Sequence, residues 1–185
     1  YRGEEFKKKT YLQLGKFEIE DQIDAAKYLG TMPFVDKDNI GHWGWSYGGF
    51  MSSLAITKGN EVFSAAVAVA PVTNWRYYDN IYTERYMRTP QENPKGYDDN
   101  SPINFTDKIK GKYLIVHGTA DDNVHFQNAT QMITEKIKSN IDLAIEKKTL
   151  LNVMYSQNVI SEKFNELLKP FELSAEQFNV LRILR

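Results

Sequence analysis

The stretch Ile40-Gly41-His42-Trp43-Gly44-Trp45-Ser46-Tyr47-Gly48-Gly49 decides the fold of this chain. It is short, aromatic-rich and β-prone up to Trp45 and takes on helical character from Tyr47, so Ser46 falls on a strand-to-helix turn. Residues 44–48 fit the pattern G-x-S-x-G, in which a serine hydroxyl projects above a sheet, and glycine on both sides leaves room where a side chain would clash. The pattern is short, and its place between a strand and a helix is what predicts a nucleophile elbow.

Strand-like and helical segments alternate on both sides of this turn. Such alternation, with connections long enough for parallel strands, predicts an α/β fold in which a mostly parallel sheet has helices on both faces. We expect strands over 40–45, 62–70 and 113–117, the second of them buried on both faces. We expect helices over 17–29, 47–57, 75–87 and 126–137, a turn at 36–39, a loop over 90–102, and an irregular segment over 1–16.

The sequence changes in character after about residue 140. From Ile141 to Arg185 only helical periodicity is found, with an end at Pro170 and a new start at Ala175, where Ser174 is an N-cap candidate and Gln177 its capping-box partner. We therefore expect an α/β unit over residues 1–140 and an all-helical segment over 141–185, with few specific contacts between them.

Composition excludes several classes of protein. The 185 residues are 42% apolar, and 23 Lys and Arg stand against 24 Asp and Glu, so there is no basic surplus for nucleic acid. The chain has no cysteine, hence no disulfide, thiolate nucleophile or cysteine metal site, and we predict neither a metal nor a cofactor. No apolar run approaches the ~18 residues of a membrane span.

The two ends carry their own expectation. The chain begins at Tyr1 without a charged-then-apolar leader, and it stops at Arg185 inside an apolar periodic pattern. We expect both ends to be cuts through larger structures, with any targeting signal outside the sequence.

A serine nucleophile in this pattern needs an acid and a histidine that follow it in the chain. Asp121 stands just past the predicted strand 113–117 and can orient and charge-stabilise a histidine. His42 and His117 lie in strands and are expected to be packed or hydrogen-bonded, and His125 is too close to Asp121 in sequence to be its partner. No histidine follows His125, so Ser46 lacks a base.

Three blocks of sequence carry a family resemblance: 44–49 (GWSYGG), 75–86 (WRYYDNIYTERY) and 117–124 (HGTADDNV). Together they resemble the prolyl oligopeptidase family, most closely its dipeptidyl peptidase IV branch, over about residues 1–138. The resemblance implies an incomplete α/β-hydrolase fold and, in the complete form, a serine exopeptidase that releases Xaa-Pro dipeptides from peptide N-termini.

The resemblance also implies roles for individual residues. Ser46 would be the nucleophile, Asp121 the triad acid and the Tyr47 amide an oxyanion donor. Asn123 would hydrogen-bond a substrate carbonyl of a peptide with proline at its second position. Flat aromatic walls suit a compact apolar ring, and the residues implied to line the proline pocket are Val72, Trp75, Tyr78, Tyr82 and Val124.

The chain departs from the family's pattern in three ways. The family's triad histidine comes after one more strand, where this chain continues with the helical segment. The family's upstream oxyanion tyrosine lies before Tyr1, and the propeller whose acidic residues hold the substrate's free amine lies outside this chain. We therefore expect the chain alone not to turn over substrate.

Residues 141–185 look like the start of a MarR-type transcriptional regulator, whose first helix forms dimers. Acidic and basic residues balance in this segment, so no nucleic-acid binding is expected from this chain alone. A homodimer is expected as a possibility. The alternatives are therefore a peptidase fragment, a regulator fragment fused near residue 140 to a hydrolase remnant, and a non-catalytic binding protein. A peptidase would be periplasmic or extracellular, and a regulator cytoplasmic.

Overall fold

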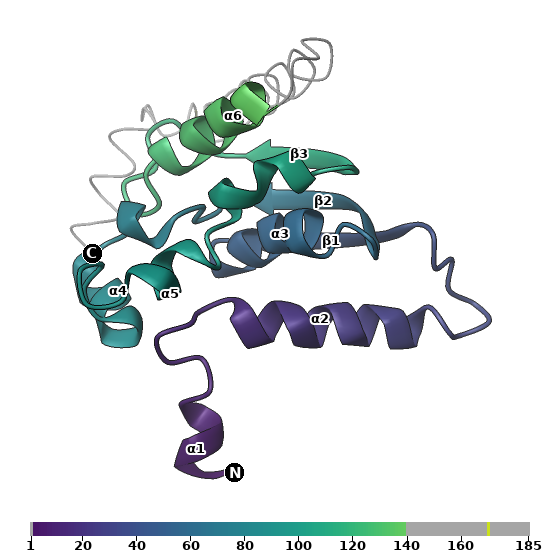
Figure 1. Ribbon diagram of the computed structural model, residues 1–185. Helices are drawn as coiled ribbons and strands as arrows, with labels where there is room; N and C mark the ends of the chain where they lie inside the picture. The colour runs from purple at the N-terminus through teal and green to yellow at the C-terminus, as the bar shows by residue number, and fades with distance from the viewer. Residues whose placement is uncertain (1, 140–169, 171–185) are drawn as a thin grey trace.

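A computed structural model describes residues 2–139 and residue 170 of the chain (Figure 1). Within 141–185 only residue 170 is described, so the expectations for that segment, including the helix that ends at Pro170 and the restart at Ala175, lie outside the described residues. The described elements are α1 (Gly3–Lys7), α2 (Lys16–Leu29), β1 (Ile40–Trp45), α3 (Tyr47–Lys58), β2 (Phe63–Val69), η1 (Trp75–Tyr77), α4 (Asn80–Met87), α5 (Pro94–Asp98), η2 (Pro102–Lys108), β3 (Lys112–Val116) and α6 (Gln127–Ser139).

The described strands form one parallel sheet in the order β1-β2-β3, which confirms the predicted strand positions and direction. Trp43 pairs with Val67 and Trp45 with Val69, and Val69 pairs in turn with Val116. Because the strands are parallel, all three end at the same edge of the sheet. The segments that follow β1, β2 and β3 therefore start side by side.

The helices that contact the described sheet pack on one of its faces. Ala66 and Ala68 of β2 point to this face and are buried, and α3 crosses it against β1 and β2. The other face carries Trp43 and Trp45 of β1, whose side chains are 69% and 68% exposed. The expectation that the strand over 62–70 is buried on both faces is therefore wrong for its second face, where Val67 and Val69 are only half-buried.

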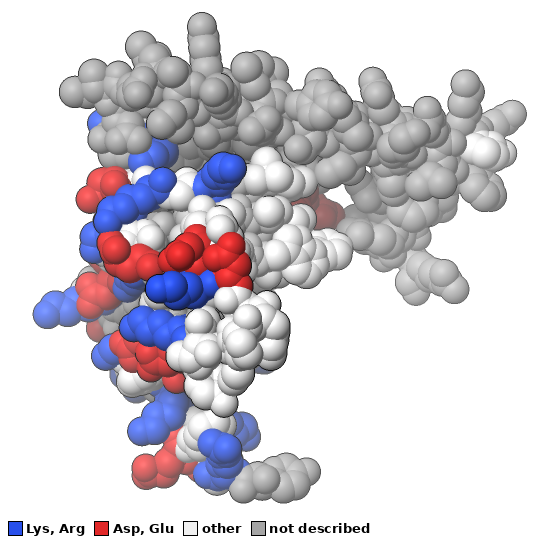
Figure 2. Space-filling model, turned by 90° about the vertical axis from the view of Figure 1, so that its right-hand side faces the viewer, with Lys and Arg blue, Asp and Glu red and all other residues white. Residues whose placement is uncertain are grey.

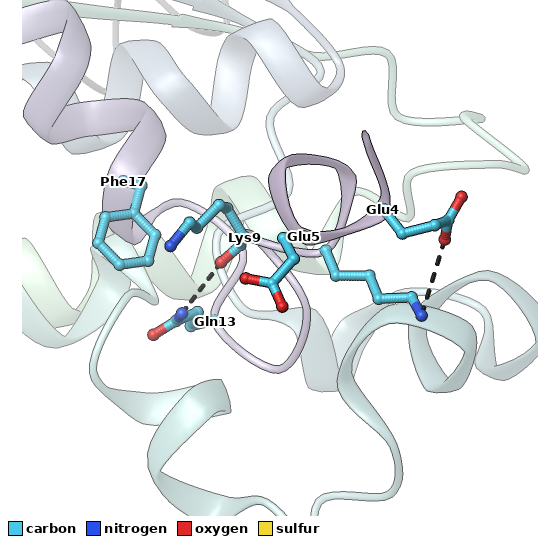
Figure 3. Close-up of a pocket in the computed structure, with 6 residues that line it drawn as sticks. Glu4, Glu5, Lys9, Gln13 and Phe17 are labelled. Carbon is cyan, nitrogen blue, oxygen red and sulfur yellow. Dashed lines mark hydrogen bonds and ion pairs between the residues drawn. The ribbon is translucent and has the colours of Figure 1, made fainter. Parts of the chain in front are cut away.

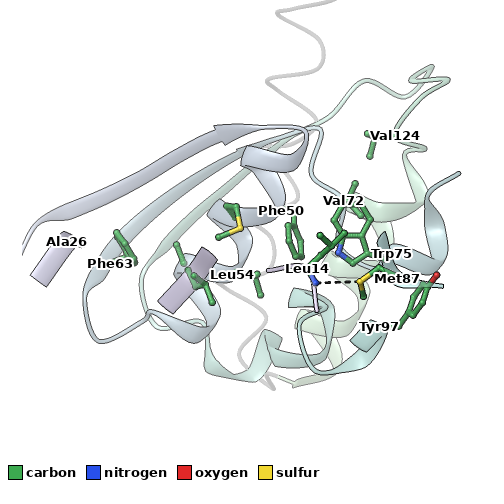
Figure 4. Close-up of a cluster of buried hydrophobic side chains, with 13 residues drawn as sticks. Leu14, Ala26, Phe50, Leu54, Phe63, Val72, Trp75, Met87, Tyr97 and Val124 are labelled. Atoms are coloured by element: carbon green, nitrogen blue, oxygen red, sulfur yellow. Dashed lines mark hydrogen bonds between the residues drawn. The ribbon is translucent and has the colours of Figure 1, made fainter. Parts of the chain in front are cut away.

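The main core lies between α3 and the segments around it (Figure 4). Phe50 is its centre, with no exposed surface, and its ring meets Trp75 edge-on at 5.1 Å between centroids. A second cluster joins β3 to α6. The buried members of the main cluster are Leu14, Ile19, Ala26, Phe50, Met51, Leu54, Ala55, Phe63, Val72, Trp75, Met87, Tyr97 and Val124.

The structure differs from the expected helices in two places. The predicted helix over 75–87 is broken into η1 and α4, because Asn74 caps the first piece and Asp79 the second with side-chain hydrogen bonds to backbone amides. The loop expected over 90–102 contains α5, which Asn93 caps and Pro94 begins. Within the segment expected to be irregular, α1 buries no residue and extends away from the rest of the fold (Figure 1).

Charges of both signs are interspersed on the surface that Figure 2 shows, as expected for a chain with a net charge of −1. Every helix in the described part of the chain is too short or too polar to cross a membrane.

The burial of Phe50 predicts a large effect of its removal. We expect Phe50→Ala to lower the free energy of unfolding by about 3–5 kcal/mol, because the cavity removes contacts with Tyr47 and Trp75 as well as the transfer energy of the ring. Urea unfolding followed by circular dichroism measures it. Phe34→Ala is the control, since Phe34 is 82% exposed, and equal losses in the two variants would contradict this core.

Candidate active site

Ser46 occupies the tip of the turn between β1 and α3, as predicted. Its backbone has φ 59° and ψ −115°, a conformation that costs a non-glycine residue energy. The Ser46 amide donates to Val69 O at 2.9 Å, and the Ser46 carbonyl accepts from Phe50 N at 2.9 Å. The Ser46 side chain does not cap α3. The backbone is therefore held at both groups while the hydroxyl stays available.

The glycines around Ser46 differ in what they permit. A Cβ on Gly44 would lie 2.2 Å from Gly48 O, and one on Gly49 would lie 2.7 Å from Val69 O. Among the described residues, a Cβ on Gly48 would meet nothing within 4 Å. The expectation that glycine is needed on both sides of Ser46 is therefore right at 44 and wrong at 48, and the second close approach is made by Gly49.

Tyr47 begins α3, where the first-turn amides have no acceptor inside the helix and face a favourable dipole for an anion. Its phenol donates to Glu18 Oε1 at 2.7 Å, while Glu18 Oε2 accepts from Gly15 N at 3.1 Å. Burial raises the pKa of Tyr47, so its hydroxyl remains a donor. Glu18 thus joins the start of α2 to the serine turn.

The aromatic residues implied by the resemblance form one cluster beside this turn. The Tyr47 ring lies 5.6 Å from that of Trp75, and Trp75 stacks on Tyr82 at 5.9 Å with 19° between planes. Tyr78 meets Tyr82 edge-on at 5.2 Å. Val72, Trp75 and Val124 are buried in the core beneath, which leaves the half-buried Tyr78 and Tyr82 as the aromatic surface open to a ligand.

Asp121 lies in the loop that follows β3. Its Oδ1 accepts from the amides of Asn123 and Val124 at 3.1 and 3.0 Å, and its Oδ2 lies 3.7 Å from His117 Nε2. One carboxylate oxygen therefore fixes the loop and the other is not committed to a backbone donor. The Asp121 side chain is partly exposed and can be reached by a group from another loop.

The three histidines occupy the places expected of structural residues. His117 is 2% exposed and its Nε2 lies 2.6 Å from Val124 O, so this nitrogen carries the proton and donates. His42 bridges Ser52 of α3 and Gln22 of α2, at 2.8 and 2.6 Å. Burial lowers the pKa of both His42 and His117. His125 is exposed and follows the acid loop directly.

Two residues of the site were missed from the sequence. Glu18 carries no motif of its own, and its partner Tyr47 lies 29 positions away. Asn128 is fully buried and accepts from Thr73 N at 2.9 Å, and it donates to His125 O at 3.1 Å. The one available signal was an amide residue among the apolar positions of the predicted helix 126–137.

The described surface also has hollows away from this turn. One is lined by Glu4, Glu5, Lys8, Lys9, Gln13 and Phe17 (Figure 3). It contains no residue predicted for the site, and two of its charged side chains, Lys8 and Glu4, pair with each other at 3.7 Å. Across residues 2–139 no cluster of three or more His, Asp or Glu side chains could hold a metal ion.

Serine, aromatic cluster and acid thus follow β1, β2 and β3 and meet at one edge of the sheet. A sequence model of the prolyl oligopeptidase family matches residues 1–150. The chain belongs to the prolyl oligopeptidase family. The match extends ten residues past the boundary expected at 140, while the division at that boundary and the likeness of 141–185 to a MarR-type regulator stay predictions.

Individual relatives belong to the dipeptidyl peptidase branch. The chain is 44% identical over 145 residues to dipeptidyl peptidase 4 of Felis catus, covering 77% of this chain and 19% of the relative. It is 53% identical over 131 residues to a Paracoccidioides lutzii protein named "Probable dipeptidyl-aminopeptidase B", covering 69% of this chain and 14% of the relative.

A solved structure supports the fold. Dipeptidyl peptidase 4 of Porphyromonas gingivalis matches 76% of this chain with a TM-score of 0.73 and 51% identity, over 20% of its own length. The incomplete α/β-hydrolase fold is therefore confirmed, and the chain spans between a seventh and a fifth of the length of these three proteins.

The unequal glycines give a matched pair of variants. We expect Gly44→Ala to lower the free energy of unfolding by about 1–3 kcal/mol, because the new methyl group collides with backbone that cannot move aside. Gly48→Ala is expected to leave stability unchanged or to raise it by up to about 1 kcal/mol, since it lies in a helix with open space around it. Urea unfolding of both variants measures these changes. A larger loss of stability in Gly48→Ala than in Gly44→Ala would contradict this geometry of the turn.

The buried histidines predict a pH dependence of stability. Because the folded pKa values of His42 and His117 lie below the ordinary value of about 6.5, the unfolded chain binds more protons than the folded chain just below that pH. Stability should be greatest above about pH 6.5 and fall as the pH decreases toward about 5, by at most ~1.4 kcal/mol per pH unit for each group.

Urea unfolding at several pH values measures this slope. His117→Gln and His42→Gln should each make it shallower, and His125→Gln, at an exposed position, is the matched control. A stability that rises on acidification through this window would show that these imidazoles are protonated in the folded state.

Proposed function

We propose that the chain carries the nucleophile, the acid and the primary pocket of a serine dipeptidyl peptidase that takes peptides with proline at the second position. The observation that carries the proposal is the direct contact between the serine turn and the aromatic cluster. Tyr47 follows Ser46 and sets its ring 5.6 Å from Trp75, which stacks on Tyr82. A ring held at Tyr78 and Tyr82 would therefore lie beside the nucleophile.

In this proposal the Ser46 hydroxyl attacks the carbonyl carbon of the proline residue. The Tyr47 amide donates to the oxygen on which negative charge develops, where a helix start is favourable for an anion. Asp121 orients a histidine and stabilises its charged form. Val72 and Val124 form the apolar base beneath the rings, and Asn123 donates to the carbonyl that precedes the proline.

Proton transfer from Ser46 is the step that this chain does not supply. His42 and His117 are engaged with Ser52, Gln22 and Val124, and His125 leads from the acid loop into α6. Recognition and turnover are therefore separable in this chain. We propose that it binds a proline-type ligand and leaves it intact.

Binding and turnover are measured on the same purified chain. Alanyl-pyrrolidide, which keeps the proline ring and the preceding carbonyl, should bind saturably in an NMR titration, and Gly-Pro p-nitroanilide should be hydrolysed no faster with the chain than with Ser46→Ala, since residual catalysis without a complete triad is small. Ser46→Ala should retain binding of the pyrrolidide, because the pocket lies in other residues.

Two results would contradict the proposal. Absence of pyrrolidide binding to a folded chain would remove the pocket assignment. Fast hydrolysis that is lost in Ser46→Ala would show that the chain contains a base that the geometry of its histidines does not suggest.

A further inference from the structure

The hydroxyl of Tyr78 donates to Asn123 Oδ1 at 2.9 Å. We infer that this hydroxyl is a positioning group: it holds the Asn123 carboxamide so that its amide nitrogen is presented to the carbonyl before the proline ring. Tyr78 would then have two separate duties, one for its ring in the pocket and one for its hydroxyl. The inference rests on the proposed function. It adds that the Tyr78 hydroxyl helps the site select ligands whose proline nitrogen carries an acyl group.

The carboxamide of Asn123 can be oriented by a single bond. An asparagine side chain has one acceptor oxygen and two N–H donors. Once Oδ1 accepts from Tyr78, its position is fixed and both donors remain for other groups. Among residues 2–139 no acceptor engages the Asn123 amide nitrogen, and Asn123 is exposed. The side chain thus combines a held acceptor with a donor that a ligand can reach.

The bond between Tyr78 and Asn123 is built by the fold rather than by chance contact of two surface groups. Asn128 is fully buried, and its Oδ1 accepts from Thr73 N at 2.9 Å while its backbone carbonyl accepts from Thr73 Oγ1 at 2.8 Å. These bonds join the segment after β2 to the start of α6. Tyr78 lies on the first of these segments, and Asn123 lies in the loop that leads into α6. The buried bonds between Thr73 and Asn128 therefore set the distance between Tyr78 and Asn123.

Asn123 is also fixed through its backbone. Its amide donates to Asp121 Oδ1, as does that of Val124, and the Val124 carbonyl accepts from His117 Nε2. The loop backbone around Asn123 is thus held by Asp121 and His117, so that rotation of the Asn123 side chain is set by its own contacts. Removing the Tyr78 hydroxyl would release that rotation without touching the loop.

The test compares two ligands that differ only in the carbonyl. Alanyl-pyrrolidide has an oxygen that accepts a strong hydrogen bond, and its thioxo analogue has a sulfur in the same place, a weak acceptor. The ratio of their dissociation constants, measured by NMR titration of the full chain, reports the Asn123 bond, whereas a general loss of structure would weaken both ligands alike.

We expect Tyr78→Phe to reduce the preference for the oxo ligand by about three- to tenfold, the range of one neutral hydrogen bond, while the ring still lines the pocket. Asn123→Ala should reduce it by a similar factor, and the double variant should lose no more than either single variant. Tyr86→Phe is the matched control, because the Tyr86 ring lies 5.0 Å from the ring of Tyr82 in the same aromatic cluster but is not assigned to the pocket; its oxo preference should equal that of the unchanged chain.

The outcomes separate this inference from the proposed function. If the unchanged chain binds neither ligand, the proposed function fails and the inference with it. A second outcome is that the unchanged chain binds both ligands, with the original ratio kept in Tyr78→Phe and lost in Asn123→Ala. In that case Asn123 binds the carbonyl without the Tyr78 hydroxyl, and the inference is overturned while the proposed function stands. An equal loss of ratio in Tyr86→Phe would also overturn it, since any change in the aromatic cluster would then produce the same effect.

Discussion

The close approach of Gly44 to the backbone of Gly48 is the constraint on which the site depends. It lets α3 begin directly at the end of β1, and so tight a reversal leaves Ser46 in a strained conformation with φ 59°. The energy that opposes the strain comes from elsewhere. Val69 O holds the Ser46 amide, and Phe50, one turn later, lies in the centre of the core. The position of the serine is therefore set by the sheet and the core.

Tyr47 transmits this constraint outward. Its amide belongs to the start of α3, its ring packs against Trp75, and its phenol is held by Glu18. One residue thus connects the serine turn, the aromatic pocket and α2. Because each contact fixes a different part of Tyr47, the proposed oxyanion donor and the proposed pocket wall cannot move independently. This coupling explains physically why a bulky tyrosine, rather than a small residue, suits the position after Ser46.

The sequence predicted the elements whose determinants are local. The bounds of β1 were correct because the glycine-rich turn ends the strand sharply, and α2 and α3 followed from apolar spacing. The break at Tyr78 between η1 and α4 was not predicted, since the side chains of Asn74 and Asp79 capture backbone amides and override the helical spacing. Glu18 and Asn128 could not be found because their bonds to Tyr47 and Thr73 join positions 29 and 55 residues apart.

The arrangement of the sheet divides recognition from chemistry. The serine turn, the aromatic cluster and the acid loop follow three adjacent parallel strands, so one edge of the described sheet brings them together. Proton transfer needs a base on a further element, and the buried His117 cannot take that role while its Nε2 proton is given to Val124 O and burial favours its neutral form. In the proposed function, ligand affinity depends on groups that follow these three strands, whereas the rate depends on a base that they do not supply. The proposed pocket can therefore be complete in a chain whose proposed catalytic triad is not.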